Sequence, residues 1–172
     1  MATQFPEWLR IKVQSYDGAM VVAGSRSLDE SAKQWSQIPV RHAHRRGWCI
    51  IVSDEAGVAY QVQLAAARAG VAYVVLGCQQ MGTLRHEVKS DRKTAFLVPG
   101  GDERTCFAIR DKALVELAML APKRGFLGLQ DDTSRDIQNI LDAAKAANVP
   151  GVLYEYDGEE AVVVERFNIA ET

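Results

Sequence analysis

Ala19-Met-Val-Val-Ala-Gly24-Ser25-Arg26-Ser27 is the stretch around which this chain is organised. Its apolar run ends at a glycine, and the polar segment that follows, residues 28–31, is typical of the start of a helix. This order predicts a buried parallel strand that feeds an α-helix. Ligands of open α/β sheets bind outside the carboxyl ends of such strands, so Gly24, Ser25 and Arg26 are candidates for holding a phosphate. The simpler interpretation is a tight turn in which one of the two serines caps the helix.

Composition sets the class of protein. The chain has 172 residues, 48% of them apolar, and a net charge of −2, which fits one domain with a substantial core. We divide it into a peripheral N-terminal segment, residues 1–18, which could pack on the domain or on a second copy, and a domain over residues 19–172. The sequence has no long apolar stretch and no signal-peptide pattern, so we expect a cytoplasmic protein. The three cysteines are far apart, and we expect them to be reduced core residues.

A second apolar run, residues 49–53, leads directly into Asp54 and Glu55, and a helical pattern then continues to about residue 69. As helix caps these two acids need no function. They would nevertheless face the same crevice as the Gly24 turn if the two strands are neighbours. Gly57, in the first turn of that helix, costs stability and suggests that something approaches the backbone closely.

The helix predicted over residues 105–121 is the most informative in the chain. Its apolar arc, at 100° per residue, contains Cys106, Phe107, Ala113, Leu114, Leu117, Ala118, Leu120 and Ala121. Arg110 falls in the middle of that arc, and a buried arginine requires an acceptor. The alternatives are a bound anion, a structural ion pair with Asp54 or Asp131, and a side chain that reaches solvent past the helix end.

A basic cluster lies in the preceding part of the chain. The helix predicted over residues 28–46 is interrupted at Pro39 and ends at Gly47, and its second half carries Arg41-His-Ala-His-Arg-Arg46. Cations are favourably placed at a helix C-terminus, so we interpret this cluster as a solvated helix end. His42 and His44 diverge on a helix, so a metal site is not expected.

The alternation of strands and helices continues to the end of the chain. Strands are predicted over residues 71–76, 95–98, 125–129 and 151–154, and a last one over 161–167 could be an antiparallel edge strand. The turn after residue 129 carries Asp131, Thr133 and Ser134. This pattern predicts an α/β fold: a single three-layer Rossmann-like domain with a mainly parallel central sheet.

The order of four motifs resembles the SLOG superfamily of Rossmann-like proteins. The motifs are Val21-Val-Ala-Gly24-Ser25-Arg26, Ser53-Asp54-Glu-Ala-Gly57, Ile109-Arg110-Asp111-Lys-Ala-Leu114 and Gln130-Asp131-Asp-Thr-Ser-Arg-Asp-Ile137. That superfamily includes the cytokinin-activating phosphoribohydrolases, the DNA-processing protein A domain and small bacterial nucleotide-binding proteins, and the last branch is the most similar. The resemblance covers about residues 19–155 and implies nucleotide binding at these four motifs.

The chain also departs from the family pattern. Ser53 stands where the family usually has glycine, and residues 130–137 lack the glycine-threonine pair that lines a phosphate pocket in relatives. Pro99-Gly100-Gly101 precedes the Arg110 helix and lacks the glutamate of the phosphoribohydrolase motif. These departures argue against cleavage of a glycosidic bond by the family mechanism.

These observations lead to one main prediction of function and two alternatives. The main prediction is a crevice that binds a nucleotide or nucleotide-derived ligand. The first alternative is a hydrolase or transferase of a nucleoside or nucleotide N-glycosidic bond, with Asp54 or Glu55 as nucleophile or base. The second is an assembly protein with a degenerate pocket. The ligand-binding residues would be Gly24, Ser25, Arg26, Asp54, Glu55, Gly57, Arg110, Asp111, Asp131, Thr133 and Ser134.

The partners we expect are a nucleotide-like small molecule and further copies of the chain, as a dimer or a larger assembly. We expect no metal, no cofactor and no membrane. Because the net charge is close to zero, we also do not expect nucleic acid as a partner.

Overall fold

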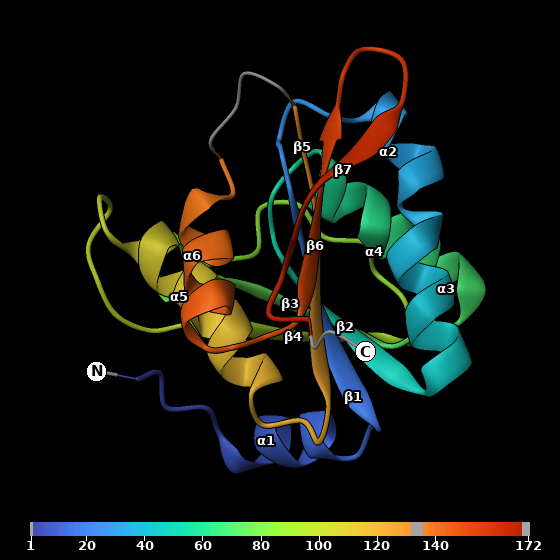
Figure 1. Cartoon of the computed structure of the whole chain (residues 1–172). Coiled ribbons are helices and arrows are strands. Elements are labelled where there is room, and N and C mark those ends of the chain that lie inside the picture. The colour runs from blue at the N-terminus through green and yellow to red at the C-terminus, as the bar shows by residue number, and fades with distance from the viewer. Residues whose placement is uncertain (1, 132–135, 170–172) are drawn as a thin grey trace.

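The computed structural model describes residues 2–131 and 136–169, in which a seven-stranded sheet lies between two layers of helices (Figure 1). The strand order is β4-β3-β2-β1-β5-β6-β7; neighbouring strands are parallel throughout except for β6 and β7, which pair antiparallel. The strands are β1 (Gly18–Gly24), β2 (Trp48–Ser53), β3 (Tyr73–Cys78), β4 (Lys93–Val98), β5 (Arg124–Asp131), β6 (Gly151–Tyr156) and β7 (Ala161–Phe167). The predicted fold class, the central position of the first strand and the antiparallel edge strand are confirmed.

Helices cover both faces of the sheet. They are α1 (Glu7–Gln14), α2 (Glu30–Trp35), α3 (Gln37–Arg46), α4 (Val58–Ala69), the short 3-10 helix η1 (Gln79–Met81), α5 (Cys106–Ala118) and α6 (Gln138–Ala146). In Figure 1, where the sheet is seen edge-on, α2, α3 and α4 lie on one side and α5 and α6 on the other. No helix in the described ranges combines the length and apolarity that crossing a membrane requires.

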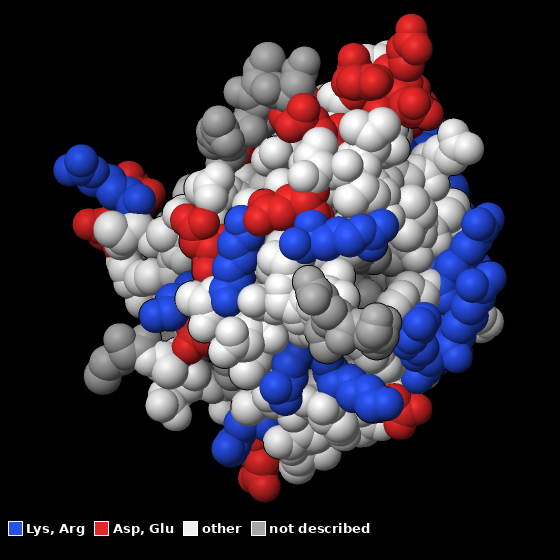
Figure 2. All heavy atoms as spheres, viewed as in Figure 1, with Lys and Arg blue, Asp and Glu red and all other residues white. Residues whose placement is uncertain are grey.

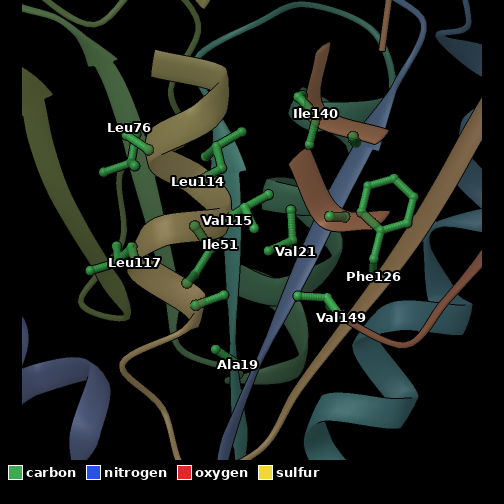
Figure 3. Packing of buried hydrophobic residues seen from close by; sticks show 14 of the residues in the cluster. Ala19, Val21, Ile51, Leu76, Leu114, Val115, Leu117, Phe126, Ile140 and Val149 are labelled. Carbon is green, nitrogen blue, oxygen red and sulfur yellow. The ribbon is translucent and has the colours of Figure 1, made fainter. Parts of the chain in front are cut away.

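The sequence of β1 explains why it is central. Ala19, Val21 and Ala23 point into the cluster under α5 and α6, whereas Met20 and Val22 point into the cluster under α2, α3 and α4. A strand buried on both faces has to be apolar at every position, and the burial of all seven residues of β1 agrees with this. Figure 3 shows the first cluster, in which side chains of α5 and α6 meet those of β1, β2, β3 and β5.

The N-terminal segment packs against its own chain. Leu9 and Val13 of α1 are fully buried in the α5–α6 cluster, and Phe5 meets Phe96 of β4 edge to face. The division of the chain at residue 18 stays a prediction.

The interruption between α2 and α3 lies at Ser36 and not at Pro39, where the sequence pattern placed it. Pro39 is the third residue of α3, a position where a helix needs no backbone N–H. Gly47, with a φ of 67°, ends α3 as predicted.

Candidate functional site

Arg110 lies at the carboxyl edge of the sheet with a side chain that is only 2% exposed. Its Nη1 donates to Asp54 Oδ1 at 3.0 Å, and its Nε and Nη2 donate to Asp111 Oδ1 at 3.1 and 2.8 Å. Nη2 also donates to Glu55 Oε1. Of the alternatives drawn from the helix pattern, the ion pair with Asp54 is present. The guanidinium is thus held by carboxylates that the chain itself supplies.

Burial and charge act on this cluster in opposite directions. Burial alone would lower the pKa of Arg110, but the carboxylates of Asp111, Glu55 and Asp54 raise it above its ordinary value. Burial raises the pKa of Asp111 to about 6, although the adjacent guanidinium opposes that rise. Arg110 therefore stays charged at any physiological pH, whereas Asp111 takes up a proton just below neutrality.

The raised pKa of Asp111 predicts a pH-dependent stability. A carboxyl with pKa 3.8 in the unfolded chain and about 6 in the folded one favours folding when protonated. That contribution is fully present below pH 3.8 and is lost as the pH rises through about 6. The wild type should therefore lose roughly 3 kcal/mol relative to Asp111→Asn between about pH 4 and 7. Urea unfolding of both proteins across this range measures the difference, and parallel profiles would contradict the prediction.

The Gly24 turn is packed tightly against the start of α4. A Cβ on Gly24 would collide with the side chain of Val58, and one on Gly57 would lie 2.6 Å from Arg26 O and closer still to Ser25 O. The predicted close approach to the Gly57 backbone is therefore made by the chain itself. Gly57 precedes α4 as its N-cap residue and is not inside its first turn, where the sequence placed it.

Backbone amides at these turns already have acceptors. Ser25 N donates to Leu129 O at 3.0 Å, Val58 N to Ser25 O at 3.3 Å, and Asp54 N to Leu76 O at 3.1 Å. An anion at this edge would be met mainly by side chains.

Arg26 reaches out from the turn, and its side chain is 58% exposed. Its Nε lies 3.6 Å from Glu55 Oε2 and its Nη2 lies 3.5 Å from Asp136 Oδ1. The backbone N of Arg26 donates to Asp136 Oδ2 at 3.2 Å. A carboxylate thus holds both the amide and the guanidinium of the residue that was expected to meet a phosphate.

Arg85 and Phe107 belong to this site although no sequence motif pointed to them. Arg85 N donates to Asp54 Oδ2 at 2.9 Å, and its guanidinium lies over the Phe107 ring, 4.4 Å from the centroid. The Arg110 guanidinium lies 5.1 Å from the same centroid. Arg85 comes from a segment without periodicity, and Phe107 was assigned to the apolar arc of its helix.

These side chains surround a hollow of ≈ 230 Å³, lined by Arg26, Glu55, Arg85, Phe107, Ala108, Arg110, Asp111, Asp136 and Asn139. Four predicted site residues line it: Arg26, Glu55, Arg110 and Asp111. Of the others, Gly24, Ser25, Asp54 and Gly57 are buried and do not line the hollow.

Of the remaining predicted residues, Asp131 is the last residue of β5. Asp131 Oδ2 accepts from Ser27 Oγ at 2.6 Å, and Asp131 N donates to Ser25 Oγ at 3.1 Å, which ties the β5 end to the Gly24 turn. Thr133 and Ser134 lie outside the described residues. Across residues 2–131 and 136–169, no three His, Cys, Asp or Glu side chains gather as metal ligands would.

Comparisons with known proteins identify the fold. No family model matches the chain, and no curated protein matches it. Among solved structures, DNA processing protein A from Helicobacter pylori is similar, with a TM-score of 0.60 and 14% identity over 87% of this chain and 71% of that one. The structure of that protein is described as showing a single-stranded DNA binding mode. This likeness confirms a Rossmann-like fold of the type found in DNA processing protein A. Membership of the SLOG superfamily stays a prediction.

This likeness corrects one expectation. We did not expect nucleic acid as a partner, but a protein of this fold is described as binding single-stranded DNA. The expectation rested on a net charge of −2, which is an average over the chain. Affinity for a polyanion depends on where cations gather, and a protein of nearly neutral net charge can still present them together on one face.

Proposed function

We propose that the hollow at the carboxyl edge binds nucleotides through their phosphates, either as free nucleotides or as units of a single-stranded nucleic acid. One observation carries this proposal: Arg26 and Arg85, from different loops, place two exposed or partly exposed guanidiniums on the rim of one hollow. Arg110 is excluded from this role because three carboxylates occupy its guanidinium.

The chemistry of the rim suits a nucleotide. Guanidinium groups bind phosphate oxygens with two parallel hydrogen bonds, and they also stack on flat rings. Arg85 lies over the Phe107 ring, so the flat surface that it offers to a base is its own guanidinium, and sites for single-stranded nucleic acid use arginine in this way. The likeness to DNA processing protein A supports the same class of ligand.

Asp136 is the internal competitor of such a ligand. Its carboxylate oxygens lie at the Arg26 amide and guanidinium, where phosphate oxygens would bind. A phosphate can take these positions only by displacing Asp136, so we expect the carboxylate to weaken binding.

Two substitutions should change affinity in opposite directions. Arg26→Ala removes a charge-assisted hydrogen bond worth roughly 1.5–3 kcal/mol, so binding should weaken by about tenfold to a hundredfold. Asp136→Asn removes the competing charge, so binding should strengthen. Isothermal titration with AMP, ADP-ribose and NAD, and fluorescence anisotropy with a labelled oligothymidylate, measure both changes and separate free nucleotides from nucleic acid.

Arg10→Ala is the matched control, since Arg10 is exposed on α1 and lies outside the hollow. It should bind as the wild type does. A wild type that binds none of these ligands, or an Arg26→Ala variant that binds as tightly as the control, would disprove the proposal.

A second candidate is hydrolysis of an N-glycosidic bond, and the position of Glu55 favours it. Both acids already have partners: Arg110 and the amide of Arg85 bind Asp54, and Glu55 is bound by Arg110 at Oε1 and lies 3.6 Å from Arg26 Nε at Oε2. Glu55 lines the hollow, whereas Asp54 is 1% exposed and does not line it. Glu55 is therefore the better of the two predicted acids for a base or nucleophile. Release of ribose 5-phosphate from nucleoside monophosphates by the wild type, and its loss in Glu55→Gln, is the test.

A further inference from the structure

The outward face of α3 carries a dense group of cations that the proposed site does not use. The buried face of this helix is apolar, with Pro39, Val40 and Ala43 in the core. Arg41 and Arg45, on the opposite face, and Arg46, at the helix end, are exposed to solvent. Figure 2 shows Lys and Arg side chains gathered over the side of the molecule where α3 lies.

These arginines line a hollow of ≈ 350 Å³ whose wall is made by Ile38, Arg41, His42, Arg45 and Arg46. Among the residues that the structure describes, no carboxylate forms an ion pair with Arg41, Arg45 or Arg46. Burial, and after it the charge of Arg46, lowers the pKa of His42, so at neutral pH the arginines carry the charge. Because none of the described carboxylates neutralises these arginines, the hollow is suited to an anionic partner.

We propose that this face of α3, called the α3 arginine face and made of Arg41, Arg45 and Arg46, binds the phosphate backbone of a single-stranded nucleic acid whose other part occupies the carboxyl-edge hollow. The proposal rests on the proposed function. It adds a second, sequence-independent contact that a free nucleotide is too short to make.

The topology connects the two places. The Gly24 turn leads directly into α2 and then α3, and both helices lie on one face of the sheet (Figure 1). α3 ends where β2 begins, so it runs from the carboxyl edge towards the amino edge, and its ten residues span about 15 Å. A single-stranded nucleic acid that leaves the carboxyl-edge hollow at Arg26 and follows α2 and α3 would reach Arg45 and Arg46 last.

The acidic hairpin between β6 and β7 is the main competitor for these cations. Arg41 lines a further hollow together with Glu159 and Glu160 of that hairpin, whereas Arg45 and Arg46 do not line it. Of the three arginines, Arg41 therefore has its positive electrostatic potential reduced most by the hairpin. Arg45 and Arg46 are the residues that report on the nucleic acid contact.

The test uses the double variant Arg45→Glu/Arg46→Glu, with Arg10→Glu/Lys12→Glu as its control. The control reverses two exposed charges on α1, which packs with α5 on the opposite side of the sheet. Affinity for a fluorescent oligothymidylate of about 20 nucleotides, longer than the usual site on one domain, is measured by anisotropy at several salt concentrations. AMP affinity is measured in parallel.

The α3 variant should bind the oligothymidylate at least about tenfold more weakly than the control and bind AMP unchanged. The slope of log affinity against log salt should fall by roughly 0.7 for each phosphate group that the protein no longer neutralises. Arg26→Ala, in contrast, should weaken both ligands, so failure of the α3 arginine face and failure of the carboxyl-edge site give different results.

Three outcomes would overturn the proposal. One is an oligothymidylate affinity and salt slope equal to those of the control, and another is a wild type that does not bind the oligonucleotide. The third is an α3 variant whose molar mass by light scattering falls from that of an assembly to that of a single chain, which would assign the face to the acidic hairpin of a second copy.

Discussion

Replacing Arg110 with methionine should destabilise the protein by about 3–5 kcal/mol, because it leaves Asp111 without its cation and Asp54 with only the Arg85 guanidinium, 3.8 Å away. Asp54 and Asp111 are 1% and 5% exposed, so water cannot replace the missing guanidinium at either group. For a chain of this size, each kcal/mol corresponds to roughly 2–4 °C, so the melting temperature should fall by about 10 °C. Thermal and urea unfolding of the wild type and Arg110→Met measure the effect.

Arg26→Ala is the control for this experiment. It removes another arginine of the same hollow, but one whose own side chain is exposed and whose ion contacts are 3.5 Å or longer, so it should cost less than about 1 kcal/mol. The two variants therefore separate stability from binding. An Arg110→Met protein that is as stable as the wild type but no longer binds nucleotides would show that Arg110 serves the ligand.

Gly57→Ala should also be strongly destabilising, by about 2–5 kcal/mol. The new methyl group would meet the carbonyl oxygens of Ser25 and Arg26, which are backbone atoms fixed at the end of β1. A φ of +78° adds its own cost for any residue with a side chain, roughly 1–2 kcal/mol, to the steric cost of roughly 1–3 kcal/mol. Urea unfolding measures the total.

Gly70→Ala is the comparison for a positive φ without a steric clash, since Gly70 has a φ of +71° and no atom near its missing Cβ. Its ψ of 24° lies in the left-handed helical region, whereas the ψ of Gly57, −131°, lies outside it, where residues with a Cβ are more strained. This variant should lose only the cost of a left-handed conformation, roughly 1–2 kcal/mol. Equal losses for the two variants would mean that the Gly24 turn yields to the methyl group, and the proposed fit between the turns would be wrong.

The fold could be predicted from the sequence because its signals are local and repeat along the chain. Apolar runs such as residues 19–23 and 49–52 are buried on both faces of the sheet, so they are apolar at every position. The same reasoning placed Arg110 in an apolar environment and predicted that it needs an acceptor, and Asp54 was one of the acceptors named. The break between α2 and α3 at Ser36 could not be predicted, because no glycine or proline marks that position in the sequence.

The candidate site was less predictable because its geometry depends on contacts between distant segments. Arg85 comes from the irregular segment between β3 and β4, where neither periodicity nor a turn motif indicates the direction of a side chain. Gly57 looked like a point of approach for a ligand, but a glycine that accommodates another turn of the chain has the same sequence pattern. The position of Asp136 beside Arg26 depends on the pairing of β1 with β5.

That pairing also has a consequence for biosynthesis. β1 pairs with β2 on one side, but its partner on the other side is β5, where Ala19 faces Arg124. While the ribosome is still making the residues between them, the first four strands can assemble only a half-sheet with β1 at its open edge. An apolar strand with unpaired backbone groups is a template for aggregation, and contacts so distant in sequence form slowly. The nascent chain should therefore depend on chaperones until residue 131 has left the exit tunnel.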